Sequence, residues 1–323
     1  MRVHDVRERI VPGRIATVVV VLLLAAVWTG AGTTLFAGDA GATPAGSSGA
    51  AGGSIVTRTL TNAAGTRDFQ QYRPVGAGPG RPLIVWLHGA SQVDRGDPRQ
   101  LRRTSVLLTE ADRQGYAVVA PMQSLRADPA GTWRLTDPSN FVRGKGEASI
   151  VADIVRRAVR ELQADPARVY LVGHSAGGAM TQNVAALYPE VFAGIATSAG
   201  IPFAADPTGA AAAIARTDRG PLPTLIVQGD RDSVTPPILG EIGVSAALGA
   251  NGIRGVRGSS ATIPATVSGD PYSSVVTRYG RGQQEVVSAV VHGADHWTGP
   301  GGVTVNGPAL DRLLIDFLVS KHR

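Results

Sequence analysis

The sequence contains no cysteine and only two lysines, and both scarcities narrow what the protein can be. Without cysteine there can be no disulfide framework, no thiolate zinc site and no cysteine nucleophile. Arginine supplies nearly all of the 31 basic residues, and the formal net charge is +6. The arginines are scattered and no basic run is interleaved with aromatic residues, unlike the basic stripe of a nucleic-acid-binding protein. We therefore expect no nucleic-acid partner. Neither a Rossmann nor a Walker phosphate loop is present, so no nucleotide cofactor is expected either.

Charge is also absent from a stretch that follows a charged N-terminus. The first 14 residues hold four arginines, and residues 15–28 form an apolar run. This order is typical of a signal peptide, and small residues at 40–42 form a candidate cleavage site. Because no charge occurs from 15 to 38, the segment is also long enough to remain as a membrane anchor. Both alternatives predict a protein that is secreted or held on the outer face of the cytoplasmic membrane.

Composition divides the chain into a leader, a linker and one domain. We expect a signal peptide or signal anchor at 1–42. A flexible linker is expected at 43–54, where nearly every residue is Gly, Ala, Ser or Thr. The remaining residues, 55–323, suffice for a single large catalytic domain.

Apolar strand-like runs alternate with helix-like patterns along this domain. An opening antiparallel pair is expected at 55–60 and 68–74. Buried strands are expected at 82–88, 116–121, 169–172, 192–196, 224–228 and 286–292. Helices are expected at 104–114, 150–162, after residue 175, and at 310–318. The alternation predicts an α/β fold with a mostly parallel central sheet and helices on both faces, whose chemistry lies at the carboxyl ends of the strands.

The stretch Gly-His-Ser-Ala-Gly at 173–177 lies between an expected strand and an expected helix. A strained turn at this place is where a nucleophile elbow presents its serine, so Ser175 is the candidate nucleophile. Gly173 and Gly177 remove side chains that would collide in so sharp a turn. The amide of Ala176, at the start of the helix, is a candidate donor to an oxyanion.

A serine nucleophile needs a base, and the order expected on this fold is serine, acid and then histidine. Three histidines follow Ser175. His322 is expected in a solvated tail, and His292 is expected to be packed at the end of a strand. His296 lies in a loop beyond that strand, so we expect it to be the base.

Two aspartates follow the strand expected at 224–228. Asp232 lies further into the loop and is better placed to reach the base. Asp230, beside Gly229, is suited to capping the turn. We favour Asp232 as the acid and keep Asp230 as the alternative, whereas Asp295 is too close to its histidine neighbour and is expected to be solvated.

A metal site is not expected. His292 and His296 are four residues apart, as in a zinc-binding helix, but Gly293 follows the first and the glutamate of that motif is missing. No cofactor of any kind is expected.

The second oxyanion donor is expected in the loop after the early buried strand. That loop reads Leu-His-Gly-Ala-Ser at 87–91. Gly89 lets the backbone approach the substrate closely, and the amide of Ala90 would be the donor, with Ser91 as the alternative. His88 and Gly89 are therefore candidate substrate-binding residues.

Together these pieces resemble the polyhydroxybutyrate (PHB) depolymerase-type esterases, which share the α/β-hydrolase fold with secreted feruloyl and acetylxylan esterases. The resemblance covers about residues 69–317. Its motifs stand at 87–92, 131–133, 143–150, 169–181, 198–202, 229–232 and 296–299. It implies the α/β-hydrolase fold, and an ester substrate that is a polyester oligomer, an acylated polysaccharide or a small ester.

The resemblance also assigns residues. It gives Ser175, Asp232 and His296 the triad positions, and Ala176 and Ala90 the oxyanion positions. It places the aromatic residues Trp133 and Trp297 beside the active site, although ordinary core packing would explain them equally well.

Two departures from the family pattern stand out. Ala90 and Thr132 occupy positions where many relatives have a cysteine pair. His174 stands where the family usually has leucine, which leaves hydrolase chemistry intact but the particular substrate open.

The sequence therefore predicts an exported serine carboxylic ester hydrolase that works through an acyl-enzyme. Three alternatives differ from it: an acyltransferase with the same triad, a non-catalytic envelope protein, and a peptidase on the same fold. Whether the ester belongs to a polyhydroxyalkanoate or carries a feruloyl or acetyl group on plant polysaccharide depends on loops such as 255–271, which have no readable signature. The oligomeric state is likewise left open.

Overall fold

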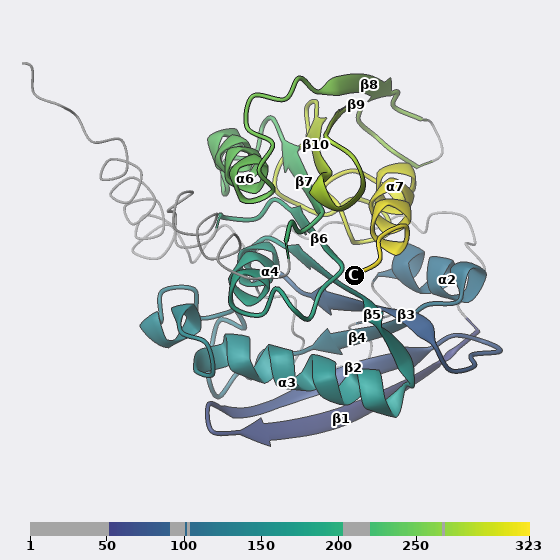
Figure 1. The fold of residues 1–323 in the computed structure, drawn as a ribbon, viewed down its shortest axis with the longest axis vertical. Helices are drawn as coiled ribbons and strands as arrows, with labels where there is room; N and C mark the ends of the chain where they lie inside the picture. The colour runs from purple at the N-terminus through teal and green to yellow at the C-terminus, as the bar shows by residue number, and fades with distance from the viewer. Residues whose placement is uncertain (1–51, 91–100, 102–103, 203–219, 267–268) are drawn as a thin grey trace, which may run out of the picture.

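Within the described part of the chain, ten strands form one central sheet (Figure 1). The computed structural model describes residues 52–90, 101, 104–202, 220–266 and 269–323. The expected leader at 1–42, most of the expected linker at 43–54, and Ser91 lie outside the described residues. The strands are β1 (Ser54–Asn62), β2 (Gly65–Arg73), β3 (Arg81–Leu87), β4 (Ala117–Pro121), β5 (Ala164–His174), β6 (Gly194–Ser198), β7 (Thr224–Gly229), β8 (Ser259–Ile263), β9 (Ser274–Tyr279) and β10 (Val286–Val291).

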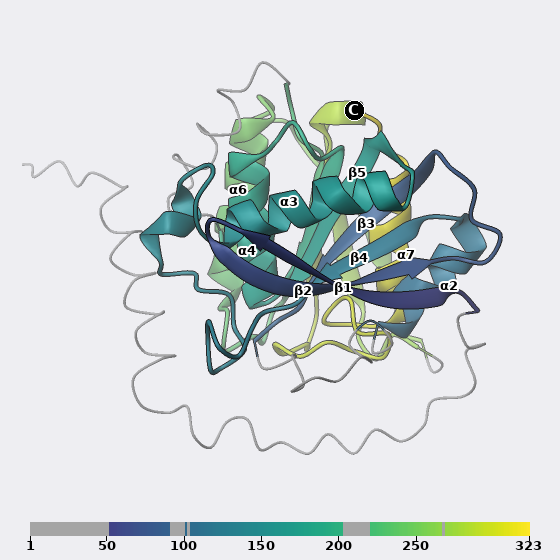
Figure 2. The same ribbon diagram turned by 90° about the horizontal axis from the view of Figure 1, so that it is seen from below.

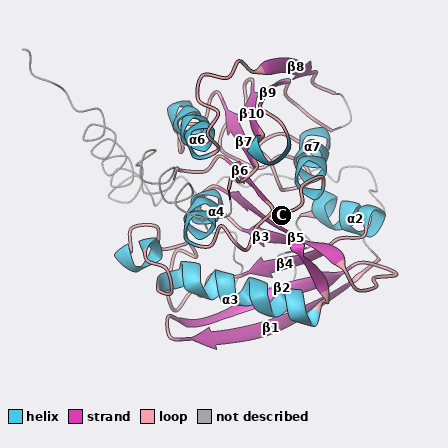
Figure 3. Ribbon diagram, in the orientation of Figure 1, coloured by secondary structure: helices cyan, strands magenta, loops and turns pink. Residues whose placement is uncertain are grey.

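Helices cover both faces of this sheet (Figure 3). They are α2 (Ser105–Gln114), α3 (Gly146–Glu161), α4 (Ala176–Leu187), α6 (Pro237–Ala250) and α7 (Pro308–Val319), with the short 3-10 helices η2 (Pro138–Phe141) and η4 (Gly282–Gln284). Figure 2 shows α3, α4 and α6 on one side of the sheet and α2 and α7 on the other. No helix of the described residues combines the length and the apolar character needed to cross a bilayer.

The centre of the sheet is parallel and its edges are antiparallel. The strand order is β1-β2-β4-β3-β5-β6-β7-β10-β9-β8. Strands β4, β3, β5, β6, β7 and β10 run parallel to one another. The β1–β2 pair at one edge and β9 and β8 at the other are antiparallel additions. All six parallel strands therefore end at one edge, where the loops that follow them meet.

The apolar side chains of the central strands pack in two separate cores, one on each face of the sheet. In β3, Ile84 and Trp86 pack in the cluster that includes α2 and α7. Leu83, Val85 and Leu87 pack in the cluster that includes α3 and α4. A strand buried on both faces needs apolar residues at every position, because successive side chains point to opposite faces.

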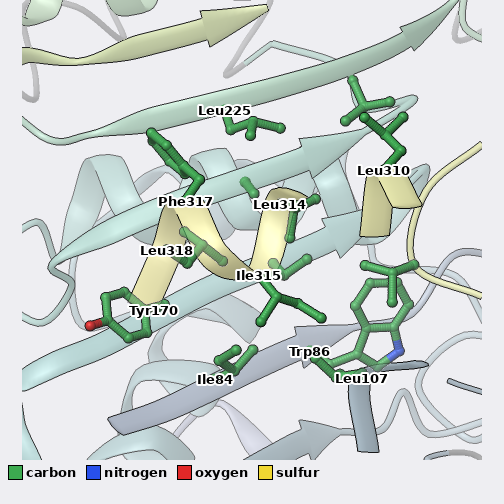
Figure 4. Packing of buried hydrophobic residues seen from close by; sticks show 14 of the residues in the cluster. Ile84, Trp86, Leu107, Tyr170, Leu225, Leu310, Leu314, Ile315, Phe317 and Leu318 are labelled. Atoms are coloured by element: carbon green, nitrogen blue, oxygen red, sulfur yellow. The ribbon is translucent and has the colours of Figure 1, made fainter. Parts of the chain in front are cut away.

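Helix α7 illustrates the packing that fixes the C-terminal part. Leu314, Ile315 and Phe317 lie in one buried cluster with Tyr170 of β5 and Leu225 of β7 (Figure 4). The helix contributes its apolar face to the sheet at helical spacing, as the sequence predicts.

Most expected elements are present, with ends that shift by a few residues. The helix expected at 150–162 starts earlier, at Gly146, where the oxygen of Asn140 accepts the amide of Glu147 and caps the first turn. The segment at 255–271, expected to be a loop, contains the edge strand β8. Neither β9 nor α6 was predicted, because α6 is rich in glycine and alanine and its apolar residues follow no single stripe.

A buried carboxyl in α7 makes the stability of the protein depend on pH. Asp311 is fully buried; its Oδ1 accepts the amide of Thr304 at 2.8 Å, and its Oδ2 has no partner. Burial raises the pKa of Asp311 to about 7. Below the pKa of the unfolded chain, near 3.8, both states are protonated and the group costs nothing. As the pH rises toward 7, the unfolded chain ionises first, so the folded state loses stability.

We expect Asp311→Asn to remove this loss, because asparagine keeps the acceptor for Thr304 and does not ionise. The unfolding free energy of the variant should exceed that of the wild type by up to about 4 kcal/mol at pH 8, with a much smaller difference near pH 4. Chemical denaturation at both pH values measures this. A difference between the two proteins that does not change with pH would contradict the assignment.

Candidate active site

Ser175 stands on a strained turn at the carboxyl end of β5. Its backbone has φ 53° and ψ −121°, a conformation that residues other than glycine rarely adopt, and α4 begins at the next residue. The turn is possible because Gly173 and Gly177, two residues before and after the serine, have no side chain. A Cβ on Gly173 would collide with the backbone of Gly177, and one on Gly177 would collide with the carbonyl of Leu87. The turn therefore presents the serine hydroxyl at the edge of the sheet, as an elbow should.

Three side chains from three loops form one hydrogen-bonded chain. Ser175 Oγ lies 2.7 Å from Nε2 of His296, and Nδ1 of His296 lies 2.9 Å from Oδ2 of Asp232. These residues follow β5, β10 and β7, which end at the same edge of the sheet. The side chains of His296 and Asp232 are 5% and 0% exposed. The structure thus brings together the three residues that the sequence favours, with the serine, histidine and carboxylate in the order that acyl transfer requires.

The carboxylate of Asp232 is saturated with donors. Its Oδ1 accepts the amides of Val234 and Thr235 at 2.9 and 2.7 Å. Its Oδ2 accepts the Thr235 hydroxyl at 2.6 Å and the Gln228 amide at 3.2 Å, in addition to His296. Burial acts to raise the pKa of Asp232, but the hydrogen bonds from His296 and Thr235 outweigh it and leave the pKa lowered. The group is therefore held as a charged carboxylate with a fixed orientation.

Asp230, the alternative acid, has a different partner. Its Oδ2 lies 3.0 Å from Nδ1 of His292, and its Oδ1 accepts the amide of Gly293 at 2.7 Å. The hydrogen bond to His292 is the main cause that lowers the pKa of Asp230. The side chain of His292 is half-exposed, so the expectation of a packed strand residue was wrong. Asp230 ties the turn after β7 to the start of the loop that carries His296.

Hydrogen bonds to and from His88 hold the loop that is expected to supply the second oxyanion donor. The amide of Gln123 can only donate, so Nε2 of His88 accepts from it at 3.0 Å, and Nδ1 of His88 donates to the carbonyl of Gly89 at 2.7 Å. Burial lowers the pKa of His88 to about 4, so this ring is neutral. Trp133 donates from Nε1 to the carbonyl of His88 at 2.9 Å. Both side chains are about 1% exposed, so they support the loop and do not face an open pocket.

The candidate oxyanion residues lie on segments that touch. A Cβ on Gly177 would meet the carbonyls of Leu87 and His88, so the start of α4 packs directly on the loop that leads to Ala90. Ala176 is in the first turn of α4, where helix amides have no partner within the helix. Ala90 is half-buried against the same core as Ala176.

Two aromatic rings adjoin His296. Trp297 is 49% exposed and meets the His296 ring edge-on, with ring centroids 5.5 Å apart. His174 lies on another side, 5.4 Å from His296, and is fully buried. Burial, followed by the proximity of His296, lowers the pKa of His174 to about 3. His174 is therefore a neutral neighbour, and Trp297 is the expected aromatic that solvent reaches.

Sequence reasoning missed two residues that hold this arrangement. Thr235 contacts both Asp232 and His296, at 2.6 and 3.2 Å, and Gln123 holds His88. A threonine three residues after an aspartate is a common turn pattern that could have indicated the first. Nothing in the local sequence indicates the second, because Gln123 and His88 are distant along the chain. Among the described residues, no group of three or more His, Asp or Glu side chains could hold a metal ion.

The chain is similar in sequence to known esterases. Residues 68–221 match the family model described as esterase PHB depolymerase. Poly(3-hydroxyalkanoate) depolymerase C of Paucimonas lemoignei is 32% identical over 139 residues, which are 43% of this chain and 32% of that protein, so the match spans about a third of that relative. A protein of Nocardia uniformis subsp. tsuyamanensis, provisionally named the esterase NocK, is 29% identical over 306 residues, with 82% of each chain covered.

The fold has solved counterparts. The acetyl xylan esterase from Aspergillus awamori superposes with a TM-score of 0.62 at 18% identity, covering 81% of this chain and 99% of that one. At this low sequence identity, the structural similarity supports the fold alone. The predicted α/β-hydrolase fold is confirmed, and so is the resemblance to the esterases.

Proposed function

We propose that this chain, which resembles the esterases of PHB depolymerase type, is an exported serine ester hydrolase. One observation carries the proposal above the others: the hydroxyl of Ser175, on its strained elbow, is hydrogen-bonded to His296, which is hydrogen-bonded to a buried carboxylate. Serine is a weak nucleophile alone, and this arrangement is what activates it.

The reaction proceeds in two halves. Ser175 Oγ attacks the ester carbonyl while Nε2 of His296 takes the hydroxyl proton. His296 then returns that proton to the leaving alcohol as the tetrahedral intermediate collapses to an acyl-enzyme. Water then attacks the acyl-enzyme while Nε2 of His296 takes one of its protons. His296 returns that proton to Ser175 Oγ as the second tetrahedral intermediate collapses, which releases the acid and the free serine. Asp232 remains charged throughout. It fixes the Nδ1–H tautomer of His296 and stabilises the imidazolium that forms.

The negative oxygen of each tetrahedral intermediate needs donors that are already in place. The amides of Ala176 and Ala90 are proposed for this role, each from a segment held rigidly against the other. One such donor is worth about 3–4 kcal/mol of transition-state stabilisation. The chemistry assigned to these residues needs no cofactor.

The substrate class is tested by ranking three esters under identical conditions: a poly(3-hydroxybutyrate) suspension, methyl ferulate and acetylated xylan. We expect measurable hydrolysis of p-nitrophenyl acetate and a clear preference for one of the three. The names of the relatives cover polyester and polysaccharide esters alike, so the ranking decides between them. Inertness toward all four compounds would refute the proposed function.

Export and the domain boundaries are part of the proposal. Residues 1–42 would direct the chain across the cytoplasmic membrane, and 43–54 would tether the domain at 55–323. Mass measurement of the mature N-terminus distinguishes cleavage near residue 42 from retention as an anchor. An intact N-terminus on a cytoplasmic protein would contradict the export proposal.

Thr235 is expected to set the geometry of the Asp232–His296 pair. Thr235→Val removes the hydroxyl and keeps the shape, so kcat on p-nitrophenyl acetate should fall about tenfold with KM unchanged, because one charge-assisted hydrogen bond to Asp232 is lost. Thr235→Ser should restore most of the activity.

Thr181→Val is the matched control for that variant. Thr181 is fully buried on α4, and its hydroxyl has no hydrogen-bond partner. The same substitution there should leave kcat near the wild-type value. Equal losses in the two valine variants would show that Thr235 acts only through packing.

A further inference from the structure

A groove of about 1140 Å³, lined by none of the proposed catalytic residues, lies at the β2–β4 side of the sheet. It is bordered by the start of β2, the segment after β4 and the start of α3. Strand β2 is antiparallel to β4, and Phe69 pairs with Pro121, so the start of β2 lies next to the end of β4. The groove therefore lies at the same edge of the sheet as Ser175.

The inner wall of the groove is joined to the proposed oxyanion loop. Gln123 lines the groove, and its amide donates to His88, two residues before Ala90. Strands β4 and β2 separate the groove from β3, and neighbouring strands are about 5 Å apart. A bound group would thus lie about 10 Å from that loop, within reach of a chain-like substrate but beyond a small ester.

The wall contains a buried ion pair with one donor left over. Arg67 is 5% exposed and donates from one terminal nitrogen to Glu147 at 2.5 Å, and Gln123 donates to the same Glu147 oxygen at 2.6 Å. The Nε of Arg67 has no partner. Because that atom is itself buried, the pair is a fixed part of the wall, and contacts to a ligand are left to the exposed side chains of the rim.

The rim carries more free positive than free negative charge. Arg134 pairs with Asp137 at 3.0 Å, and Arg67 pairs with Glu147. Arg126 and Lys145 line the groove, are exposed, and form no ion pair with any described residue.

The lining also offers acceptors. The carboxylate of Asp68 lines the groove, is exposed, and accepts the hydroxyl of Thr59 at 2.6 Å. No aromatic side chain is among the described lining residues. A ligand suited to this surface both donates and accepts hydrogen bonds and carries negative charge.

We propose that this groove binds an acidic polysaccharide chain, with sugar hydroxyls along its polar wall and a uronate carboxylate toward Arg126 and Lys145. The proposal rests on the esterase function proposed above and names the class of substrate that the enzyme would deacylate. A polyester chain fits less well, because its ester oxygens only accept hydrogen bonds, so that it offers no donor to the exposed carboxylate of Asp68 and no negative charge to Arg126 and Lys145.

The test compares acetylated glucuronoxylan with the same polymer after reduction of its uronate carboxyls to alcohols. At low ionic strength we expect kcat/KM to be about fivefold higher on the acidic polymer, the size of two exposed ion pairs. The ratio should approach one in 0.5 M sodium chloride, because salt screens exposed charges.

Variants locate the effect. Arg126→Gln combined with Lys145→Gln should reduce the acidic-to-reduced ratio to about one. Arg160→Gln combined with Arg281→Gln removes the same charge from two exposed arginines that do not line the groove, and should keep the wild-type ratio. A ratio of one for the wild type, or equal ratios in the two double variants, would overturn the proposal.

Binding without turnover separates this proposal from the esterase function. By calorimetry, the Ser175→Ala protein should bind a xylooligosaccharide carrying one methylglucuronate about fivefold more tightly than its carboxyl-reduced form. Equal affinities would overturn the groove assignment. Hydrolysis of p-nitrophenyl acetate by the wild type reports on the esterase function alone, so failure of one result does not imply failure of the other.

Discussion

Replacing Ser175 by alanine is expected to lower kcat on p-nitrophenyl acetate by about four orders of magnitude or more. The alanine side chain has no atom that can form the acyl bond, and His296 loses the proton that it would transfer. The oxyanion amides remain, so a residual rate above that of water is expected. Steady-state kinetics with an active-site titrant that acylates only the intact serine measures both the loss and the fraction of active enzyme.

His296→Ala should cause a similar loss, and the double variant should be hardly worse than either single one, because the residues act as a unit. Ser245→Ala, at an exposed position on α6, is the control for serine loss and should retain full activity. If either catalytic variant kept turnover near the wild-type value, the assignment of nucleophile and base would be wrong.

The fold was largely predictable because the central strands are buried on both faces, and burial on both faces gives the clearest hydrophobic pattern in the sequence. Each of β3, β4, β5 and β7 contains an uninterrupted apolar run, as expected of a strand that is covered on both faces. The elements at 237–279 escaped prediction for the opposite reason. β8 is an edge strand with mostly exposed side chains, and α6 has little polar–apolar contrast along its length. Edge strands carry little hydrophobic pattern because water covers much of their surface.

The proposed triad positions were found from order along the chain and from placement at strand ends, which topology enforces. The residues that support them could not be found in this way. Gln123 meets His88, and Trp133 meets the same loop, across separations of 35 and 45 residues. Such contacts depend on which strands become neighbours in the sheet, and β3 and β4 are adjacent only once the crossover has formed.

The expected aromatic positions show the same limit. Trp133 and Trp297 look alike in sequence, yet one is buried beneath the loop and the other is half-exposed beside His296. The difference arises because the Trp133 indole finds the carbonyl of His88 as an acceptor inside the core. A tryptophan is buried fully where its N–H has a partner.

Asp232→Asn is expected to lower kcat about 10³–10⁴-fold, whereas Asp230→Asn should lower it by about threefold or less. Each change replaces one carboxylate oxygen by an amide nitrogen with almost no change in shape. At Asp230 the consequence is small, because asparagine still accepts the amide of Gly293 and the partner His292 is half-exposed. Kinetics on p-nitrophenyl acetate, with the thermal midpoint measured in parallel, compares the two variants.

The large effect at Asp232 follows from the way its two oxygens are held. The amides of Val234 and Thr235 both donate to Oδ1, so the remaining oxygen of an asparagine must stay there. The new NH₂ group is then forced toward Nδ1 of His296, which can no longer donate and must accept. The proton moves to Nε2, the nitrogen that has to take the proton of Ser175, and the imidazolium loses its counter-charge. If Asp230→Asn were instead the more damaging change, Asp230 would be the acid.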